Sequence, residues 1–165
     1  MAAFFSDNEI AGLIAEVKPL LPDWHSRMTL KPKRGHRERE VDVKGEGGSR
    51  FRLILRQAAL NPLDFPVILA VLVPKTNQVF RLLRCNGKSH EHTNRLERET
   101  FYDFHIHRAT ERYQKEEGYR EDGYAEVTDK YSDFEGALGT LFDEGGFVRP
   151  STSQMDLPFA GGGGP

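Results

Sequence analysis

This chain has one cysteine, only short apolar runs and neither a P-loop nor a G-x-G-x-x-G motif for phosphate binding, and each of these features excludes a class of protein. Cys85 is the only cysteine, so neither an intramolecular disulfide nor a thiolate metal cluster is expected. The longest apolar run, Val67 to Val73, is far too short to cross a bilayer. The start MAAFFSDNEI has no basic segment before a long apolar core, so it predicts no signal peptide. We therefore expect a cytoplasmic protein with no membrane partner.

Charge is distributed unevenly, although the formal net charge of the 165 residues is only -2. Between Arg27 and Arg56 there are ten Lys and Arg residues against four Asp and Glu residues. Such an excess of positive charge indicates either a surface for nucleic acid or another anionic partner, or a pair of solvated strand faces. Both interpretations remain open from composition.

Helix signals stand at the two ends of the chain. Ser6-x-x-Glu9 has the spacing of a capping box, and the apolar periodicity behind it predicts a helix over residues 7–18. A second capping box, Ser132-x-x-Glu135, predicts a closing helix that ends at Gly145-Gly146. Residues 24–40 show no period and are expected to be irregular. Residues 110–117 are compatible with a short helix or a strand.

Strand signals fill the middle of the chain. Residues 40–44 and 50–56 flank the turn GEGGS and predict a hairpin. The continuously apolar PVILAVLV, residues 66–73, is typical of a central strand covered on both faces. Further strands are expected at residues 78–84 and 102–107, a turn is expected at Asn86-Gly87, and an edge strand is expected at residues 124–128.

These elements predict the α+β class, with a mainly antiparallel sheet of about five or six strands and an N-terminal and a C-terminal helix packed on it. We expect residues 1–148 to form a single domain. From Arg149-Pro150 onward the composition turns to Ser, Thr and Gly, so residues 149–165 are expected to be a disordered tail.

Four of the six histidines lie close together in the sequence, in SHEHTN and DFHIH. Residues two apart in a strand point the same way, so His105 and His107 are expected to share a face. If the first segment is also extended, His90 and His92 form a second pair. Two such pairs could supply imidazoles for a metal such as Zn, Ni or Fe, or for acid–base catalysis.

Three interpretations of the histidines remain open: metal-free phosphodiester chemistry, a metal site, and a solvated sheet face with no chemical role. The first needs a base and an acid, which imidazole can supply, and a cation for the phosphate, for which Arg112 is a candidate. The candidate catalytic residues are His90, His92, His105, His107 and Arg112. We rank this interpretation slightly above a metal site with the same four histidines, because basic strand residues are expected nearby; these candidate nucleic-acid contacts are Arg50, Arg52, Arg56, Arg81 and Arg84.

The segments VFRLLRCNGKSHEHTN and FYDFHIHRATERYQ resemble a bacterial domain family found in mobile-element neighbourhoods. More loosely, residues 50–140 are similar to the TumE toxins, which pair an R-Y-D-N-x-P-H-H strand with a later His-rich segment. The counterparts in this chain are Arg84, Asn86, His90, His105 and His107. Cys85 stands where TumE has an aromatic residue, and Gly87 follows Asn86. The resemblance implies a toxin-like ribonuclease and a cognate antitoxin.

The tail contains QMDLPF, residues 154–159, which resembles the peptide by which bacterial replication and repair proteins bind the DNA sliding clamp. Leu157 and Phe159 would fill an apolar subsite, Gln154 would hydrogen-bond beside it, and Met155 would add contact area. Alternatively, these side chains fold back on the sheet of the same protein. The sequence thus predicts a protein that acts on RNA or DNA without a cofactor. Its alternatives are a non-enzymatic adaptor for a partner such as the sliding clamp and a protein that binds a metal such as Zn through histidine.

Overall fold

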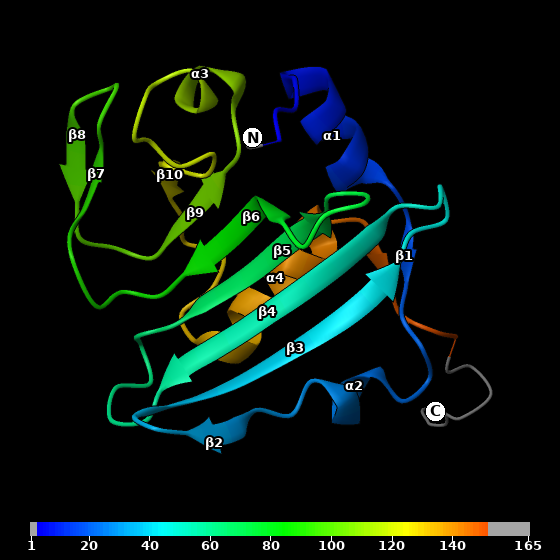
Figure 1. Ribbon diagram of the computed structural model, residues 1–165. Coiled ribbons are helices and arrows are strands. Elements are labelled where there is room, and N and C mark those ends of the chain that lie inside the picture. The colour runs from blue at the N-terminus through cyan, green and yellow to red at the C-terminus, as the bar shows by residue number, and fades with distance from the viewer. Residues whose placement is uncertain (1–2, 152–165) are drawn as a thin grey trace.

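A seven-stranded antiparallel sheet carries one long helix on its rear face in the computed structural model, which describes residues 3–151 (Figure 1). The strand order is β10-β9-β6-β5-β4-β3-β2. The bounds of these strands are β2 Lys31–Lys33, β3 His36–Lys44, β4 Arg50–Ala58, β5 Pro66–Leu72, β6 Val79–Asn86, β9 His105–Arg108 and β10 Tyr124–Val127. The expected α+β class with a mainly antiparallel sheet is confirmed, and the sheet is larger than the five or six strands expected.

Strand β5 lies at the centre of the sheet, as its continuous apolar run predicted. Its neighbours β4 and β6 contribute alternating buried residues to the same core, including Phe51, Leu53, Leu55 and Leu83. Helix α4, Phe134–Glu144, covers this face of β5 and β6 with Leu138, Leu141 and Phe142. Burial of this continuous apolar surface is the main stabilising term of the fold.

Helices form where the sequence supplies caps. Helix α1, Asp7–Ala15, begins at the predicted capping box, in which Ser6 and Glu9 cap each other's backbone N–H groups. It ends earlier than residue 18, because Lys18 belongs to the two-residue strand β1, Lys18–Pro19, which pairs with β11, Phe147–Val148. The N-cap of α4 is Asp133 rather than Ser132, and its carboxylate accepts from the N–H of Gly136.

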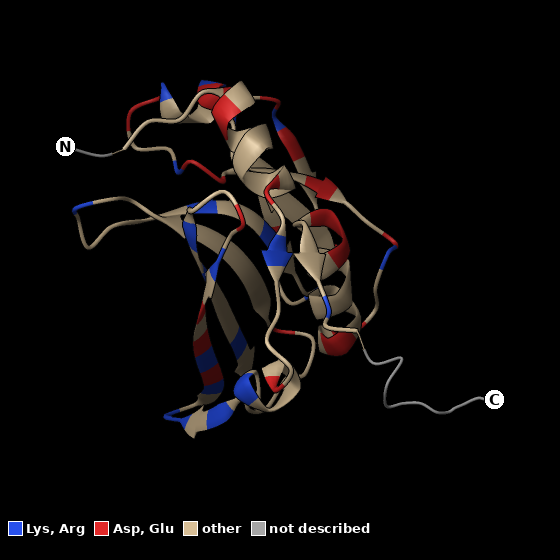
Figure 2. Cartoon of the chain, turned by 90° about the vertical axis from the view of Figure 1, so that its right-hand side faces the viewer, with Lys and Arg blue, Asp and Glu red and all other residues tan. Residues whose placement is uncertain are grey.

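Residues 24–40, expected to be irregular, contain helix α2, Trp24–Arg27, strand β2 and the first half of β3. The predicted hairpin is present and longer than expected, since its pairing continues to His36 and Ala58. Basic and acidic residues alternate over the first half of β3, from Arg37 to Glu40, so no apolar period marks that half (Figure 2). The strand is held instead by nine backbone positions paired with β4.

A register shift interrupts the pairing of β5 with β6 between Leu69 and Ala70. Leu83 pairs with Leu69 and Arg81 pairs with Ala70, so Leu82 is an extra residue. Without it, Arg81 and Arg84 would point to opposite faces; with it, both point to the face opposite α4. A bulge of this kind redirects side chains locally.

A short hairpin and a short helix lie beside the β9 end of the sheet (Figure 1). The hairpin joins β7, His92–Asn94, to β8, Glu99–Phe101. The helix is α3, Glu111–Gln114, capped by Thr110, which decides between the two structures expected for residues 110–117. Strand β9 begins at His105 rather than at residue 102, and β10 is the predicted edge strand. Within residues 3–151, no helix is long and apolar enough to cross a membrane.

Candidate functional site

Three histidines meet where the small hairpin approaches the sheet. His92 opens β7, whereas His105 and His107 lie on β9, and one ring nitrogen of each comes within 4.8 Å of the others. The ring of His92 stacks on that of His105, with centroids 5.2 Å apart, and meets His107 edge-on at 4.7 Å. The strand period of two correctly predicted that His105 and His107 share a face.

The hairpin is held against the sheet by its own polar side chains. Asn94 donates to the carbonyl of Ala125 at 2.7 Å and accepts from its N–H at 2.9 Å, as a neighbouring strand would. At the hairpin turn, the hydroxyl of Tyr113 donates to Glu97 at 2.7 Å and accepts from the N–H of Leu96. These contacts fix His92 over β9.

Each of the three rings has one nitrogen engaged in a hydrogen bond. Nδ1 of His105 donates to the carbonyl of Asp103, and Nδ1 of His107 donates to that of Asp122, both at 2.7 Å. His92 bonds through Nε2 to the Oδ1 of Asn94 at 2.8 Å. Because a carbonyl oxygen can only accept, each engaged nitrogen is the protonated one, and the other keeps its lone pair. His105 Nε2 is buried and has no hydrogen-bond partner among the described residues.

The environment keeps two of the rings, those of His105 and His107, neutral. Burial lowers the pKa of His105 to about 4, and the positive charge of Arg84 adds to that effect. Burial also lowers the pKa of His107, followed by the charge of Arg84. At neutral pH both rings are therefore electron-pair donors rather than acids.

A buried carboxylate underlies the cluster and holds three arginines. Asp122 is fully buried, and its carboxylate lies 3.0 Å from Arg84 Nε, 3.5 Å from Arg81 Nε and 3.6 Å from Arg120 Nε. Glu121 pairs with Arg81 as well, at 3.3 Å. Burial lowers the pKa of Arg84, and the charge of Asp122 opposes that shift. One carboxylate thus orients three guanidinium groups and neutralises only part of their charge.

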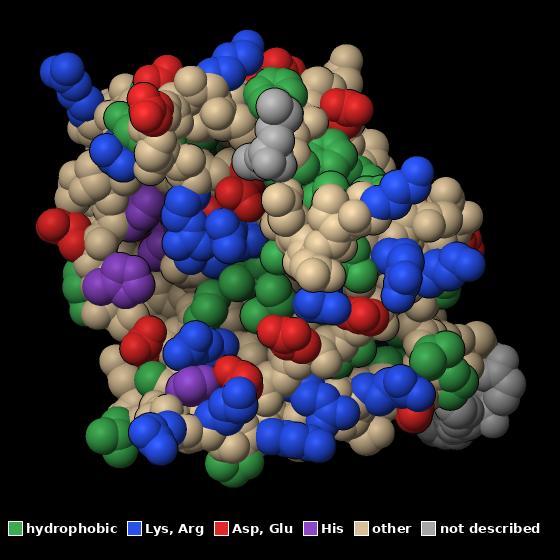
Figure 3. Space-filling view, viewed as in Figure 1, with side chains coloured by type: hydrophobic (Ala, Val, Ile, Leu, Met, Phe, Trp, Pro, Cys, Tyr) green, Lys and Arg blue, Asp and Glu red, His purple; other side chains and the backbone are tan. Residues whose placement is uncertain are grey.

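The histidines and arginines open onto a pocket of about 320 Å³. Its lining consists of Arg84, Asn86, His90, His92, Thr93, Arg95, His107, Tyr113, Gly118, Tyr119, Arg120 and Gly123. None of these described lining residues is acidic, and the guanidinium of Arg95 lies 3.9 Å from the ring centre of Tyr119. Figure 3 shows histidine side chains beside Lys and Arg side chains on this part of the surface. We call it the histidine pocket; its charge suits an anionic ligand.

The histidine pocket includes only some of the residues predicted from the sequence. His90 is exposed, lies outside β7 and lines the pocket rim, so it forms no strand pair with His92. Arg112 is not in the lining: its guanidinium pairs with Glu97 and lies 4.7 Å from the ring centre of Tyr124. The structure therefore places Arg112 outside the histidine pocket, and its role as a phosphate contact stays a prediction.

The predicted basic strand surface is divided into two parts. Arg52 on β4 pairs with Asp42 at 2.8 Å and also faces Glu40. Arg56 lies opposite Glu38 in the β3–β4 register, so acidic residues of β3 compensate much of the charge of β4. Arg50 is exposed at the start of β4. Of the five candidate arginines, only Arg84 lines the histidine pocket, and Arg81 shares its buried carboxylate.

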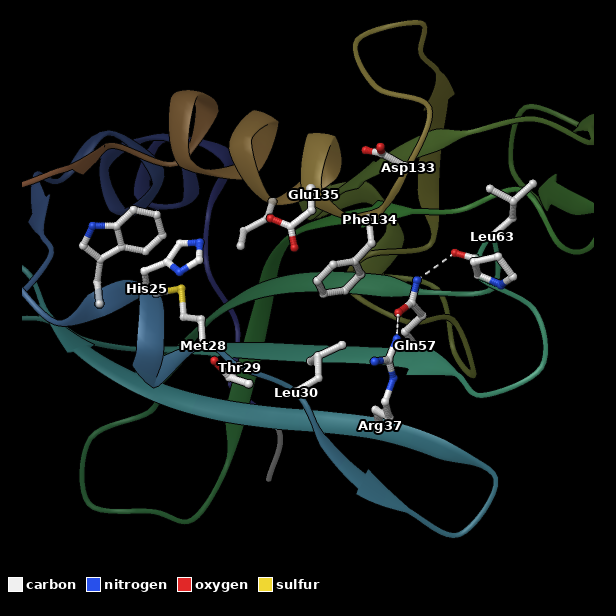
Figure 4. Close-up of a pocket in the computed structure, with 13 residues that line it drawn as sticks. His25, Met28, Thr29, Leu30, Arg37, Gln57, Leu63, Asp133, Phe134 and Glu135 are labelled. Atoms are coloured by element: carbon white, nitrogen blue, oxygen red, sulfur yellow. Dashed lines mark hydrogen bonds between the residues drawn. The ribbon is translucent and has the colours of Figure 1, made fainter. Parts of the chain in front are cut away.

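A second pocket, of about 550 Å³, lies between α2 and the start of α4 (Figure 4). Met28, Leu30 and Phe134 make it largely apolar. Two of its polar side chains are engaged: Arg37 donates to Gln57 Oε1 at 2.6 Å, and Gln57 donates to the backbone carbonyl of Pro62 at 2.9 Å. The histidine pocket, where polar atoms converge and remain available, is the better candidate for chemistry.

Sequence reasoning missed four residues of the site: Arg95, Tyr119, Arg120 and Asp122. All four lie outside regular elements, so no period of two or 3.6 marks them. The only signal was the acidic and basic run REDG at residues 120–123, which composition alone would assign to a solvated turn. The predicted clamp-binding residues Gln154, Met155, Leu157 and Phe159 lie outside the described residues.

Comparison with known proteins gave one family. Residues 32–119 match the model of the family described as "Herpesvirus immediate early protein". A search of the curated proteins and a search of the solved structures found no match. The matched segment runs from β2 through α3 and contains all three histidines of the cluster.

The resemblance to a bacterial mobile-element family and to TumE toxins is corrected by this match. That resemblance depended on a few Arg, Asn and His positions between residues 84 and 107, whereas the viral family model aligns a continuous segment that contains them. The match covers just over half of the chain. The chain therefore belongs to the herpesvirus immediate early protein family.

Proposed function

We propose that the protein binds single-stranded nucleic acid in the histidine pocket. The observation that carries the proposal is the composition of the pocket lining. The lining contains Arg84, Arg95 and Arg120, and none of its described residues is acidic. A phosphate group would be bound by the guanidinium groups, which can donate two hydrogen bonds each to its oxygens. The exposed guanidinium of Arg95, which lies over the half-buried ring of Tyr119, offers a plane on which a base would stack.

Single-stranded rather than duplex nucleic acid fits the site because the pocket is concave and small. About 320 Å³ is the scale of one bound nucleotide, and a base can reach such a pocket only when it is not paired. The proposal covers binding. Metal-free cleavage would need a protonated imidazole beside a neutral one, and the lowered pKa values of His105 and His107 disfavour that arrangement.

The test is fluorescence anisotropy with a labelled single-stranded RNA at several salt concentrations. The variant Arg95→Ala/Arg120→Ala removes two exposed pocket arginines, and Arg50→Ala/Arg56→Ala removes two exposed arginines of β4 as the matched control. We expect the pocket variant to weaken binding at least about tenfold and to reduce the salt slope by about 1.4, because each phosphate contact on a single strand contributes about 0.7.

The control also tests the surface predicted from the sequence. If the β4 variant weakens binding and the pocket variant does not, the nucleic acid lies on the strand face and the proposal is wrong. Absence of salt-dependent binding by the wild-type protein to RNA and to single-stranded DNA would also refute it.

A further inference from the structure

We infer that His92, His105 and His107 form a binding site for one transition-metal ion of the Zn²⁺ class, with a coordination position open to the histidine pocket. Three imidazoles converging on one point are the ligand set of a catalytic type of zinc site, in which the fourth position is left to water or substrate. The inference goes beyond nucleic-acid binding and does not depend on it, because metal binding can be measured with the protein alone.

The lone pairs of the three rings carry the inference. Each ring donates through one nitrogen to a carbonyl oxygen: His105 to Asp103, His107 to Asp122, and His92 to Asn94. Such outer hydrogen bonds fix the tautomer and the orientation of metal-ligating histidines and raise their basicity. The remaining nitrogen of each ring is then available to the metal.

The burial of His105 supports a ligand at these lone pairs. His105 is 1% exposed and its Nε2 has no hydrogen-bond partner in residues 3–151. A buried acceptor without a partner costs about 1–3 kcal/mol, so most native structures avoid one. A metal ion at the meeting point of the rings would supply the missing partner.

The geometry requires only small adjustments. Three nitrogens bound tetrahedrally at 2.0–2.1 Å from zinc lie about 3.3 Å apart, and here one ring nitrogen of each histidine lies within 4.8 Å of those of the other two. Each nitrogen would need to move inward by less than about 1 Å. His92 lies on the anchored two-stranded hairpin and His105 and His107 lie on the main sheet, so shifts of this size are taken up by rotation of the side chains. Imidazole ligands select Zn²⁺, Cu²⁺, Ni²⁺ or Fe²⁺ over Mg²⁺ and Ca²⁺, which prefer oxygen.

The open position faces the proposed ligand. His92 and His107 line the histidine pocket, whereas His105 lies behind them. A metal held by the three would therefore present its fourth position to the pocket that contains Arg84, Arg95 and Arg120. Such an ion would supply a Lewis-acid position beside the arginines proposed to bind phosphate.

The experiment is titration of the full chain, stripped with EDTA, with Zn²⁺ by calorimetry and with Co²⁺ by visible absorption. His92→Ala removes a ligand from the outlying hairpin, and His90→Ala removes an exposed histidine at the rim of the same pocket as the control. We expect one Zn²⁺ per chain for wild type and His90→Ala, and a loss of at least roughly 100-fold in affinity for His92→Ala, since loss of an outer partner alone costs up to that much.

Co²⁺ gives a readout that does not depend on a variant. A site with nitrogen ligands and low coordination number gives intense visible bands, whereas hydrated Co²⁺ gives weak ones. Absence of Zn²⁺ binding by the wild type, a weak hydrated Co²⁺ spectrum, or equal affinity of folded His92→Ala and wild type would overturn the inference. Measuring RNA binding on the same samples separates the two proposals: zinc without RNA refutes only the proposed function, and RNA without zinc refutes only the metal site.

Discussion

Lys18 and His105 are both buried polar side chains, and they differ in what their polar atoms contact. Lys18 is 0% exposed, and the three N–H groups of its ammonium are shared among the carbonyls of Leu13, Ile14, Glu16 and Gly145 at 2.6–3.0 Å. His105 is equally buried and leaves Nε2 without a described partner. Burial of a polar group is costly in either case. Only the Lys18 site offsets that cost within the protein itself.

The difference separates a structural role from a functional one. Lys18 donates to carbonyls at the C-terminal ends of α1 and α4, which would otherwise lack a hydrogen-bond donor. Burial lowers the pKa of Lys18 to about 8, with the charge of Glu16 opposing the shift, so the ammonium remains protonated at neutral pH. The histidine cluster, by contrast, keeps its lone pairs available at the end of the sheet that opens onto the histidine pocket.

The largest expected change in stability comes from replacing Lys18. Lys18→Met should lower the free energy of unfolding by at least about 3 kcal/mol, because it leaves several buried carbonyls without a donor. Urea denaturation measures the loss, with Lys115→Met as the control. Lys115 is exposed and its ammonium pairs with the carboxylate of Glu111 at 3.7 Å, so its replacement should change stability by less than about 0.5 kcal/mol. Equal effects of the two substitutions would show that the buried ammonium is not a structural element.

A smaller effect is expected from Asp122, which connects structure with function. Asp122→Asn should lower the free energy of unfolding by about 2 kcal/mol, the scale of a charged hydrogen bond. The loss is limited because Arg81 and Arg120 reach solvent. The same change removes the buried negative charge beneath the histidine pocket, so RNA affinity should rise while stability falls. Anisotropy and urea denaturation on one sample measure both. A parallel fall in RNA affinity would show that Asp122 orients the arginines more than it neutralises them.

Local signals in the sequence predicted much of the fold. The capping box at Ser6 and Glu9, the apolar run of β5 and the alternation of β4 each act within a few residues, and the structure contains all three. The C-terminal boundary of α1 was wrong because a tertiary contact decides it. Lys18 leaves the helical period and its ammonium contacts four carbonyls, one of them that of Gly145, the C-cap of α4.

The site was less predictable because its parts come from different segments. The period of two correctly paired His105 with His107, but the docking of Asn94 on Ala125 that brings His92 to them is a long-range contact. Arg81 and Arg84 share a face only because Leu82 is an extra residue in β6. Asp122 and Arg120 lie in a loop, and no local pattern indicates that a loop carboxylate will be buried.

The smallest expected effect is on His105, and it is the sharpest test of the comparison. In metal-free protein, His105→Phe should change the free energy of unfolding by no more than about 1 kcal/mol. The substitution loses the hydrogen bond to the Asp103 carbonyl, but it also removes the unpartnered Nε2, and the two effects oppose each other. Urea denaturation in EDTA measures the sum, and repeating it with excess Zn²⁺ should stabilise the wild type but not the variant. A loss as large as that of Lys18→Met would mean that His105 stabilises the fold as Lys18 does. A small loss of stability in His105→Phe, together with zinc stabilisation of the wild type that the variant lacks, would mean that the chain buries this imidazole for a ligand and not for its own stability.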